Sequence, residues 1–218
     1  MSERSASLIG GLSGIAALVL SIGGFALIGA AGFALQPDAS RADVATALTE
    51  GQADLALAGL FLDTLGSLFL VMFAACLWAR LRRAEGAAGW LALASFASAL
   101  LMVAAGLGDK AAYYAIFAGA DSGLDATVAT ALYDTATGFF VLFQALAGFF
   151  LLLTGAAAVR TGALRGWLGW AGVGVGAVSI ASTAAPENGF GQLALPLVFA
   201  WIVAVAVTLL RAPAAAAT

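Results

Sequence analysis

Residues 55–79 read LALAGLFLDTLGSLFLVMFAACLWA, and this stretch decides the fold class. Asp63 is its only charged residue, and Arg80 follows the stretch directly. A helix of about 20 predominantly apolar residues crosses the ~30 Å hydrocarbon core of a bilayer. The stretch therefore predicts a transmembrane helix that holds a single carboxylate.

The composition of the whole chain leads to the same class of protein. Its 218 residues are 63% hydrophobic and 10% charged, whereas about a quarter of the residues in a soluble domain are charged. So few charges cannot cover a water-facing surface. The composition therefore predicts a polytopic membrane protein.

The residue types that are missing exclude several kinds of chemistry. Histidine is absent, and Cys76 is the single cysteine. Histidine-ligated haem, a zinc protease site, a Ser-His-Asp triad and a dithiol pair all need residues that the chain lacks. The sequence also has no basic patch of the kind that binds nucleic acid. We therefore expect no metal site, no cofactor and no nucleic-acid partner.

Six apolar runs are long enough to cross a bilayer, and together they leave no segment for a soluble domain. We predict an all-α fold in which residues 1–218 form one domain of six transmembrane helices. The runs cover residues 8–35, 55–79, 90–107, 126–159, 164–184 and 193–210.

The charges between these runs alternate from loop to loop. Arginine lies before the first run and after the second, fourth and sixth runs, whereas the other loops carry mostly Asp and Glu. Cytoplasmic loops of membrane proteins are enriched in arginine and lysine. We therefore expect both termini on the cytoplasmic side of a bacterial inner membrane, with lipids as neighbours. The arginines concerned are Arg4, Arg80, Arg82, Arg83, Arg160, Arg165 and Arg211.

Asp63 is expected near other polar groups. A rise of ~1.5 Å per residue from the arginine ends places Asp63 roughly 24 Å and Gln144 roughly 22 Å above the cytoplasmic boundary. Lys110, the only lysine, lies near enough in depth to reach Asp63. Small neighbours on the same helix, Gly59 and Gly66, favour a contact between helices over a lipid-facing position.

The polar groups at this level form the candidate binding site, and the same depth count places Asp109 and Asp134 at the outer headgroups. In one interpretation Asp63 pairs with Lys110 or Gln144 and fixes the register of the helices. In another it binds a cation, a proton or a polar solute from the outer side. In a third it reaches the outer interface without a role. The candidate residues are Asp63, Thr64, Ser67, Lys110, Asp134, Thr137 and Gln144.

Two further patterns concern helix packing and internal repetition. Gly10 and Gly14 are four residues apart, as are Gly172 and Gly176, and this spacing lets helix backbones approach closely in lipid. The stretch LDTLGSLFLV from residue 62 resembles YDTATGFFVL from residue 133. The resemblance indicates either a duplicated helix pair or a shared bias for Ala, Leu and Gly.

Residues 53–83, ADLALAGLFLDTLGSLFLVMFAACLWARLRR, and residues 159–178, VRTGALRGWLGWAGVGVGAV, resemble a known family. It is a bacterial family of six-helix integral membrane proteins that is known only as a domain of unknown function. Members commonly have proline before the arginine of the second motif, whereas Leu164 precedes Arg165 here. The resemblance implies a six-helix topology and no particular activity.

Three functions remain open from the sequence. The first is a non-enzymatic binding or scaffold protein that associates through its glycine-rich faces with copies of itself or with a membrane complex. The second is a small transporter, channel or solute-capture component with a polar site around Asp63. The third is an enzyme that acts on lipid or quinone through Asp109, Lys110 and Tyr113. We expect the first and keep the second as the alternative. The third is set aside because no recognisable catalytic constellation is present.

Overall fold

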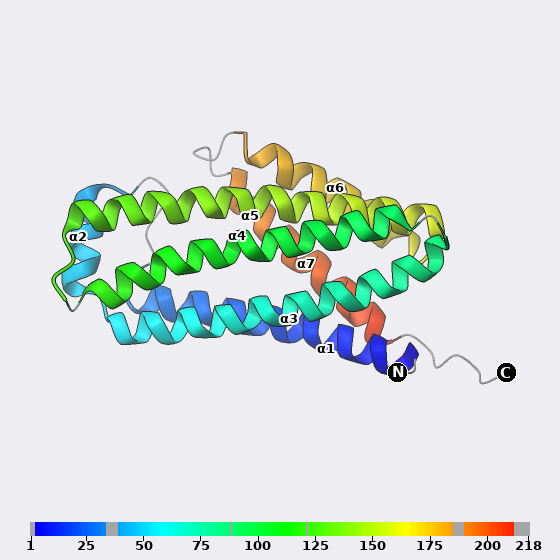
Figure 1. Ribbon diagram of the computed structural model, residues 1–218, viewed down its shortest axis with the longest axis horizontal. Helices are drawn as coiled ribbons and strands as arrows, with labels where there is room; N and C mark the ends of the chain where they lie inside the picture. The colour runs from blue at the N-terminus through cyan, green and yellow to red at the C-terminus, as the bar shows by residue number, and fades with distance from the viewer. Residues whose placement is uncertain (1–2, 34–38, 88, 121, 185–189, 212–218) are drawn as a thin grey trace.

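The computed structural model is an all-helical protein, as predicted. The residues that it describes are 3–33, 39–87, 89–120, 122–184 and 190–211. Within these ranges there are seven helices and no strand (Figure 1). The helices are α1 (Glu3–Ala30), α2 (Arg41–Glu50), α3 (Ala53–Glu85), α4 (Trp90–Ala120), α5 (Ala126–Thr161), α6 (Gly166–Ser182) and α7 (Phe190–Leu210).

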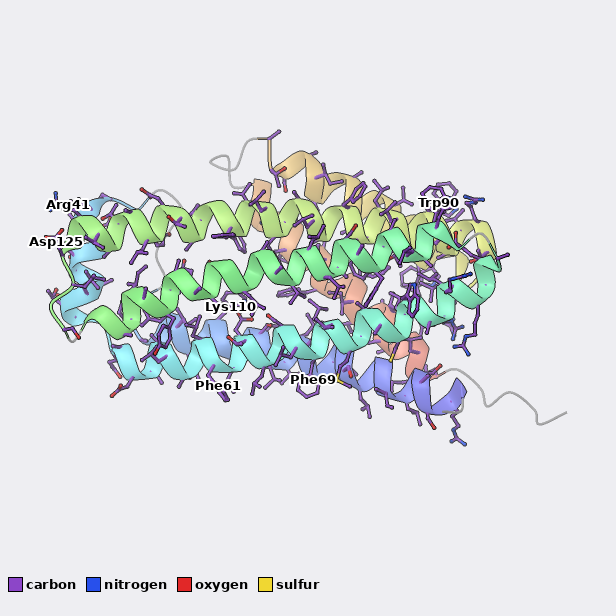
Figure 2. All side chains as sticks on the ribbon, viewed as in Figure 1. Arg41, Phe61, Phe69, Trp90, Lys110 and Asp125 are labelled. Atoms are coloured by element: carbon purple, nitrogen blue, oxygen red, sulfur yellow. The ribbon has the colours of Figure 1, made fainter. Side chains whose placement is uncertain are left out.

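Several helices have the length and composition of membrane spans. Among the described residues, α1, α3, α4 and α5 are long and apolar enough to cross a bilayer, and α6 and α7 contribute shorter apolar helices. Large apolar side chains also cover the outside of the bundle. Phe61 and Phe69 point outward from α3 (Figure 2), and Val19 and Trp170 are exposed on α1 and α6. Such extensive apolar surface is stable against lipid and unfavourable in water.

The bundle is arranged around two sets of packed helices. α1 packs along α3 and α7, α5 packs along α4 and α6, and α3 and α4 join the two sets. α1 begins and α7 ends at the same end of the bundle, where Gly11 lies against Leu210. Arg80 lies at this end too, and its Nε donates a hydrogen bond to the Ala163 carbonyl oxygen at 2.8 Å. We call this end of the bundle the arginine end.

α2 lies across the opposite end, which we call the α2 end (Figure 1). The apolar runs do not predict this helix, and the first predicted run extends to residue 35, whereas α1 ends at Ala30. A capping box starts α2, because the Ser40 hydroxyl accepts from the Asp43 amide while the Asp43 carboxylate accepts from the Ser40 amide. Val44 of α2 is then buried in a cluster with Phe33.

α4 continues well beyond residue 107, to Ala120. Its last turns are stabilised by burial, because Ile116 and Phe117 pack beneath α2 in the same cluster as Phe33. The Phe117 ring centroid lies 4.6 Å from that of Phe33. The aromatic residues that follow the third predicted run therefore belong to an extension of the helix, and Phe117 is buried inside the bundle.

Glycines allow several helices to touch through their backbones. A Cβ atom at Gly24 of α1 would lie 2.5 Å from the Gly59 oxygen of α3, and one at Gly176 of α6 would lie 2.5 Å from the Gly148 oxygen of α5. A Cβ at Gly108 of α4 would meet a ring of α5 at 2.7 Å. The first two distances are to backbone oxygens and are too short for any side chain, so only glycine permits these two backbone contacts.

Candidate functional site

A buried ion pair joins α3 to α4 in the part of the bundle nearer the α2 end. Lys110 Nζ lies 2.8 Å from Asp63 Oδ2, and the two side chains are 11% and 6% exposed. Nζ also donates to the Gly106 carbonyl oxygen at 3.3 Å. Figure 2 shows Lys110 on α4 beside α3. The depth estimate from the sequence and the structure agree on this partner for Asp63.

Small residues around Asp63 explain how a carboxylate is accommodated here. Gly59 and Gly66 precede and follow it by about one turn, and both lie against the backbone of α1. The Ser67 hydroxyl donates to the Asp63 carbonyl oxygen at 3.1 Å, which satisfies this hydroxyl within its own helix. Asp63 is therefore enclosed by α1 and α3 on one side and faces Lys110 on the other.

Asp109 adds a second carboxylate to this site. Its side chain is buried, with 8% of the residue exposed. Its Oδ1 atom has no hydrogen-bond partner among the described residues. Two aspartates and one lysine carry one net negative charge when all three are ionised. The positive charge of Lys110 is already paired with Asp63, so the uncompensated charge lies on Asp109.

Two adjacent cavities meet at these three residues. They share five lining residues, Phe25, Asp63, Asp109, Lys110 and Phe140. The larger cavity has a volume of about 340 Å³ and extends toward the α2 end, and the smaller one, of about 50 Å³, extends toward α7. Ligand pockets occupy about 300–1,000 Å³, so the larger cavity is large enough for a small organic molecule.

Aromatic rings make up much of the wall of the larger cavity. The lining side chains come from α1, α3, α4, α5 and the residues just after α1. The packed cluster around Phe33 and Phe117 lies between this cavity and α2. The aromatic members of the lining are Phe25, Phe33, Tyr113, Tyr133 and Phe140.

The predicted site residues are only partly brought together. Asp63 and Lys110 form the ion pair, Thr137 lines the larger cavity, and Ser67 lines the smaller one. The Thr64 hydroxyl donates to the Leu60 oxygen of its own helix at 2.8 Å, and Thr64 is not among the described lining residues.

Two predicted residues lie elsewhere on α5. Asp134 is exposed on the surface, so its environment differs from that of Asp63 despite the similar sequence around both. Gln144 is buried where α5 meets α6, and its backbone oxygen accepts a hydrogen bond from the Ser179 hydroxyl at 3.0 Å. Neither residue is among the described lining residues of the two cavities.

The structure also corrects the predicted position of Asp109 and adds residues that were not predicted for the site. Asp109 is buried beside Lys110 and does not lie on the surface with Asp134. Phe25, Tyr133 and Phe140 are new members of the site. A signal for Asp109 was available in the Asp-Lys dipeptide near the end of an apolar run, since intramembrane charges commonly occur in pairs. No comparable signal marks the aromatic residues.

The glycines predicted for helix packing all contact other helices of the same chain. Gly10 and Gly14 of α1 lie against Cys76 and Phe73 of α3, and Gly172 and Gly176 of α6 lie against α5. Each of these faces is therefore covered within the bundle.

Two other carboxyl groups lie outside the spanning segments and cap helices. Two hydrogen bonds from Ser40 hold the pKa of Asp43 below the ordinary value of 3.8, and the one from the Ser40 hydroxyl has a larger effect than the one from the Ser40 amide. Hydrogen bonds from Thr127 lower the pKa of Asp125, which caps α5. Both groups lie at the α2 end, and both favour the ionised form at neutral pH.

Comparisons with protein-family models, with curated proteins and with solved structures find no match for this chain. The resemblance to the six-helix bacterial family therefore stays a prediction, and the function has to be inferred from the site itself.

Proposed function

We propose that this chain is a non-enzymatic, multi-pass membrane protein that binds a small solute inside its helical bundle, in the larger cavity beside Asp63, Asp109 and Lys110. The observation that carries the proposal is the position of a cavity of about 340 Å³ against two buried carboxylates and a lysine. Ionisable groups inside a membrane protein are costly, and they commonly mark ligand or ion sites. An ion pair that served only to fix helix register would need no such cavity.

The proposed topology has six membrane-spanning helices, with α2 lying at the outer surface and both termini in the cytoplasm of a bacterial cell. The hydrogen bond from Arg80 to the α5–α6 loop supports this arrangement, because it brings arginines from separate loops to one end of the bundle. Asp43 and Asp125 lie at the other end. The distribution agrees with the enrichment of basic residues on the cytoplasmic side.

Association with a partner through glycine faces receives less support. The four glycines at helical spacing all face helices of the same chain. A scaffold would therefore need another surface, whereas a solute-binding protein can use the cavity as it stands. This comparison favours binding inside the bundle over binding between proteins.

The proposal is tested with three small probes that share a phenyl body and differ in charge. They are benzyltrimethylammonium, its neutral carbon isostere neopentylbenzene, and benzenesulfonate. Equilibrium binding of each radiolabelled probe is measured on the purified protein in detergent, with an excess of unlabelled probe to define specific binding. We expect at least one probe to bind.

A pair of variants on α5 locates the binding. Thr137→Trp places a large ring in the larger cavity, whereas Thr135→Trp places the same ring on the exposed face of the same helix. We expect Thr137→Trp to abolish specific binding and Thr135→Trp to retain it. Failure of all three probes to bind, or equal binding by the two variants, would refute the proposed function.

A further inference from the structure

We infer that the ligand of the larger cavity is a small organic cation with an apolar body, and that Asp109 is the residue that receives its positive charge. This inference rests on the proposed function and identifies the chemical class of the solute. It follows from the partners of the three charged groups, from the lining of the cavity and from its size.

The charged groups of the site differ in how fully they are already paired. Lys110 Nζ is engaged by Asp63 Oδ2 at 2.8 Å and by the Gly106 oxygen at 3.3 Å. An anion would therefore have to compete with Asp63 for this lysine. Asp109, in contrast, is more than nine-tenths buried, lines both cavities and has an oxygen without a hydrogen-bond partner in the described part of the chain. A buried acceptor of this kind is costly until a donor or a cation reaches it.

The aromatic lining also favours a positively charged ligand. The face of an aromatic ring carries partial negative charge and attracts cations, most strongly where water is excluded. Tyr113 on α4, Tyr133 on α5 and Phe25 on α1 line the cavity on different sides. A cation near Asp109 would therefore lie among rings as well as beside a carboxylate.

The size and chemistry of the cavity favour an organic cation over a metal ion. A hard metal ion requires about six oxygen ligands at 2.0–2.6 Å, and such a compact cage does not match a volume of about 340 Å³ lined by phenyl rings. An ammonium group with attached apolar groups uses both features. Its charge lies at Asp109, and its apolar groups supply van der Waals contacts to the aromatic rings.

A proton is the competitor for the same carboxylate. The titratable groups that face Asp109 are Lys110 and Tyr113 on its own helix, Asp63 on α3 and Tyr133 on α5. When Asp109 is protonated, its negative charge is lost and the cation loses its partner. Binding of the cation to the protonated site therefore releases one proton, and lowering the pH weakens binding.

The three probes of the preceding test separate the charge of the ligand from the existence of the site. We expect benzyltrimethylammonium to bind about 10- to 100-fold more tightly than neopentylbenzene, which has the same shape without the charge. Tighter or equal binding of neopentylbenzene or benzenesulfonate would overturn the assignment of a cation while leaving solute binding intact. The absence of binding by all three would instead refute the proposed function.

Variants of Asp109 test its role directly. Asp109→Asn should remove the preference for the cation and leave the affinity for neopentylbenzene within about twofold, because the amide keeps the shape and loses the charge. Asp109→Glu should keep the preference. Asp134→Asn, on the exposed face of α5, is the matched control and should change neither affinity. Retention of the full preference in Asp109→Asn would overturn the inference.

The pH dependence provides a measurement that needs no variant and remains decisive if Asp109→Asn does not fold. Affinity for benzyltrimethylammonium should fall as the pH is lowered far enough to protonate Asp109, and proton release on binding should be detected in that pH range by calorimetry in buffers of different ionisation enthalpy. Affinity for neopentylbenzene should not follow this trend. A cation affinity that stays constant down to the pH at which the protein unfolds, with no proton released, would overturn the proton competition and the role of Asp109 together.

Discussion

Replacement of Lys110 by methionine should be the most damaging single change in the site. The variant removes the positive charge and keeps most of the side-chain volume. The wild-type site contains two carboxylates and one ammonium group, and Lys110→Met leaves Asp63 and Asp109 without any cation. Breaking a buried ion pair by removing one partner costs about 3–5 kcal/mol, whereas an exposed pair contributes about 0–1 kcal/mol. The 2.8 Å pair, with side chains 11% and 6% exposed, belongs to the buried class.

The effect of Asp63→Asn should be smaller, and this asymmetry follows from the third charge. After Asp63→Asn, Lys110 still has Asp109 as a neighbour of opposite charge, so no net charge is left in the site. We expect a loss of about 1–3 kcal/mol for this variant, close to that of a lost hydrogen bond to a charged group. In the double variant Asp63→Asn/Lys110→Met, the loss in the free energy of unfolding should be about 0.5–3 kcal/mol smaller than the sum of the two single losses.

Thermal unfolding in detergent measures these differences. A chain of this size loses about 2–4 °C in Tm per kcal/mol, so Lys110→Met should lower Tm by about 6–20 °C. Arg41→Met, which removes an exposed cation from α2 (Figure 2), is the control and should lower Tm by less than about 4 °C. Equal effects of Lys110→Met and Asp63→Asn, or strictly additive losses in the double variant, would refute the reasoning that the three charges act as one group.

Three further predictions concern packing, hydrogen bonding and pH. Gly176→Ala should destabilise the protein by about 1–3 kcal/mol, because its Cβ would lie 2.5 Å from an oxygen of α5, whereas Gly174→Ala, which meets nothing within 4 Å, should raise Tm slightly in the same thermal assay. Trp201→Phe should cost about 1–3 kcal/mol by leaving a buried carbonyl of α6 without its 2.9 Å donor, and equal stability of this variant and the wild type would contradict that role. Because hydrogen bonds lower the pKa of Asp43 from 3.8, its contribution to the start of α2 is full above that value and is lost as the pH falls through the folded-state pKa. Hydrogen-exchange protection of α2 should fall in this acidic range in the wild type and show no such step in Asp43→Asn.

The sequence predicts the levels of the polar groups along the helices better than the directions in which they face. Counting from the arginine ends brings Asp63 and Lys110 to similar depths, and the structure pairs them. The rotation of each helix depends on its neighbours, which the count does not include. For this reason Asp134, which resembles Asp63 in its sequence surroundings, lies on an exposed face. Asp109 is the exception in level, because the predicted run ends at residue 107 whereas α4 continues to Ala120 and Asp109 is buried within it.

The long apolar runs predict helices well because few alternatives exist in lipid, where every backbone polar group needs a partner within the chain. The run predicted for residues 126–159 corresponds to Ala126–Thr161. At the α2 end this constraint weakens, and local hydrogen bonds and packing take over. The capping box of α2 and the burial of Phe117 are of this kind, and a hydropathy pattern does not contain them.

The glycine contacts have a mechanical consequence for the cavity. Backbone contact at Gly24 and Gly59 joins α1 closely to α3, and α4 and α5 pack against each other as a second body. The larger cavity lies between these two bodies. The Asp63–Lys110 ion pair joins the two bodies beside the cavity. Any widening of the cavity would therefore have to lengthen or break this pair.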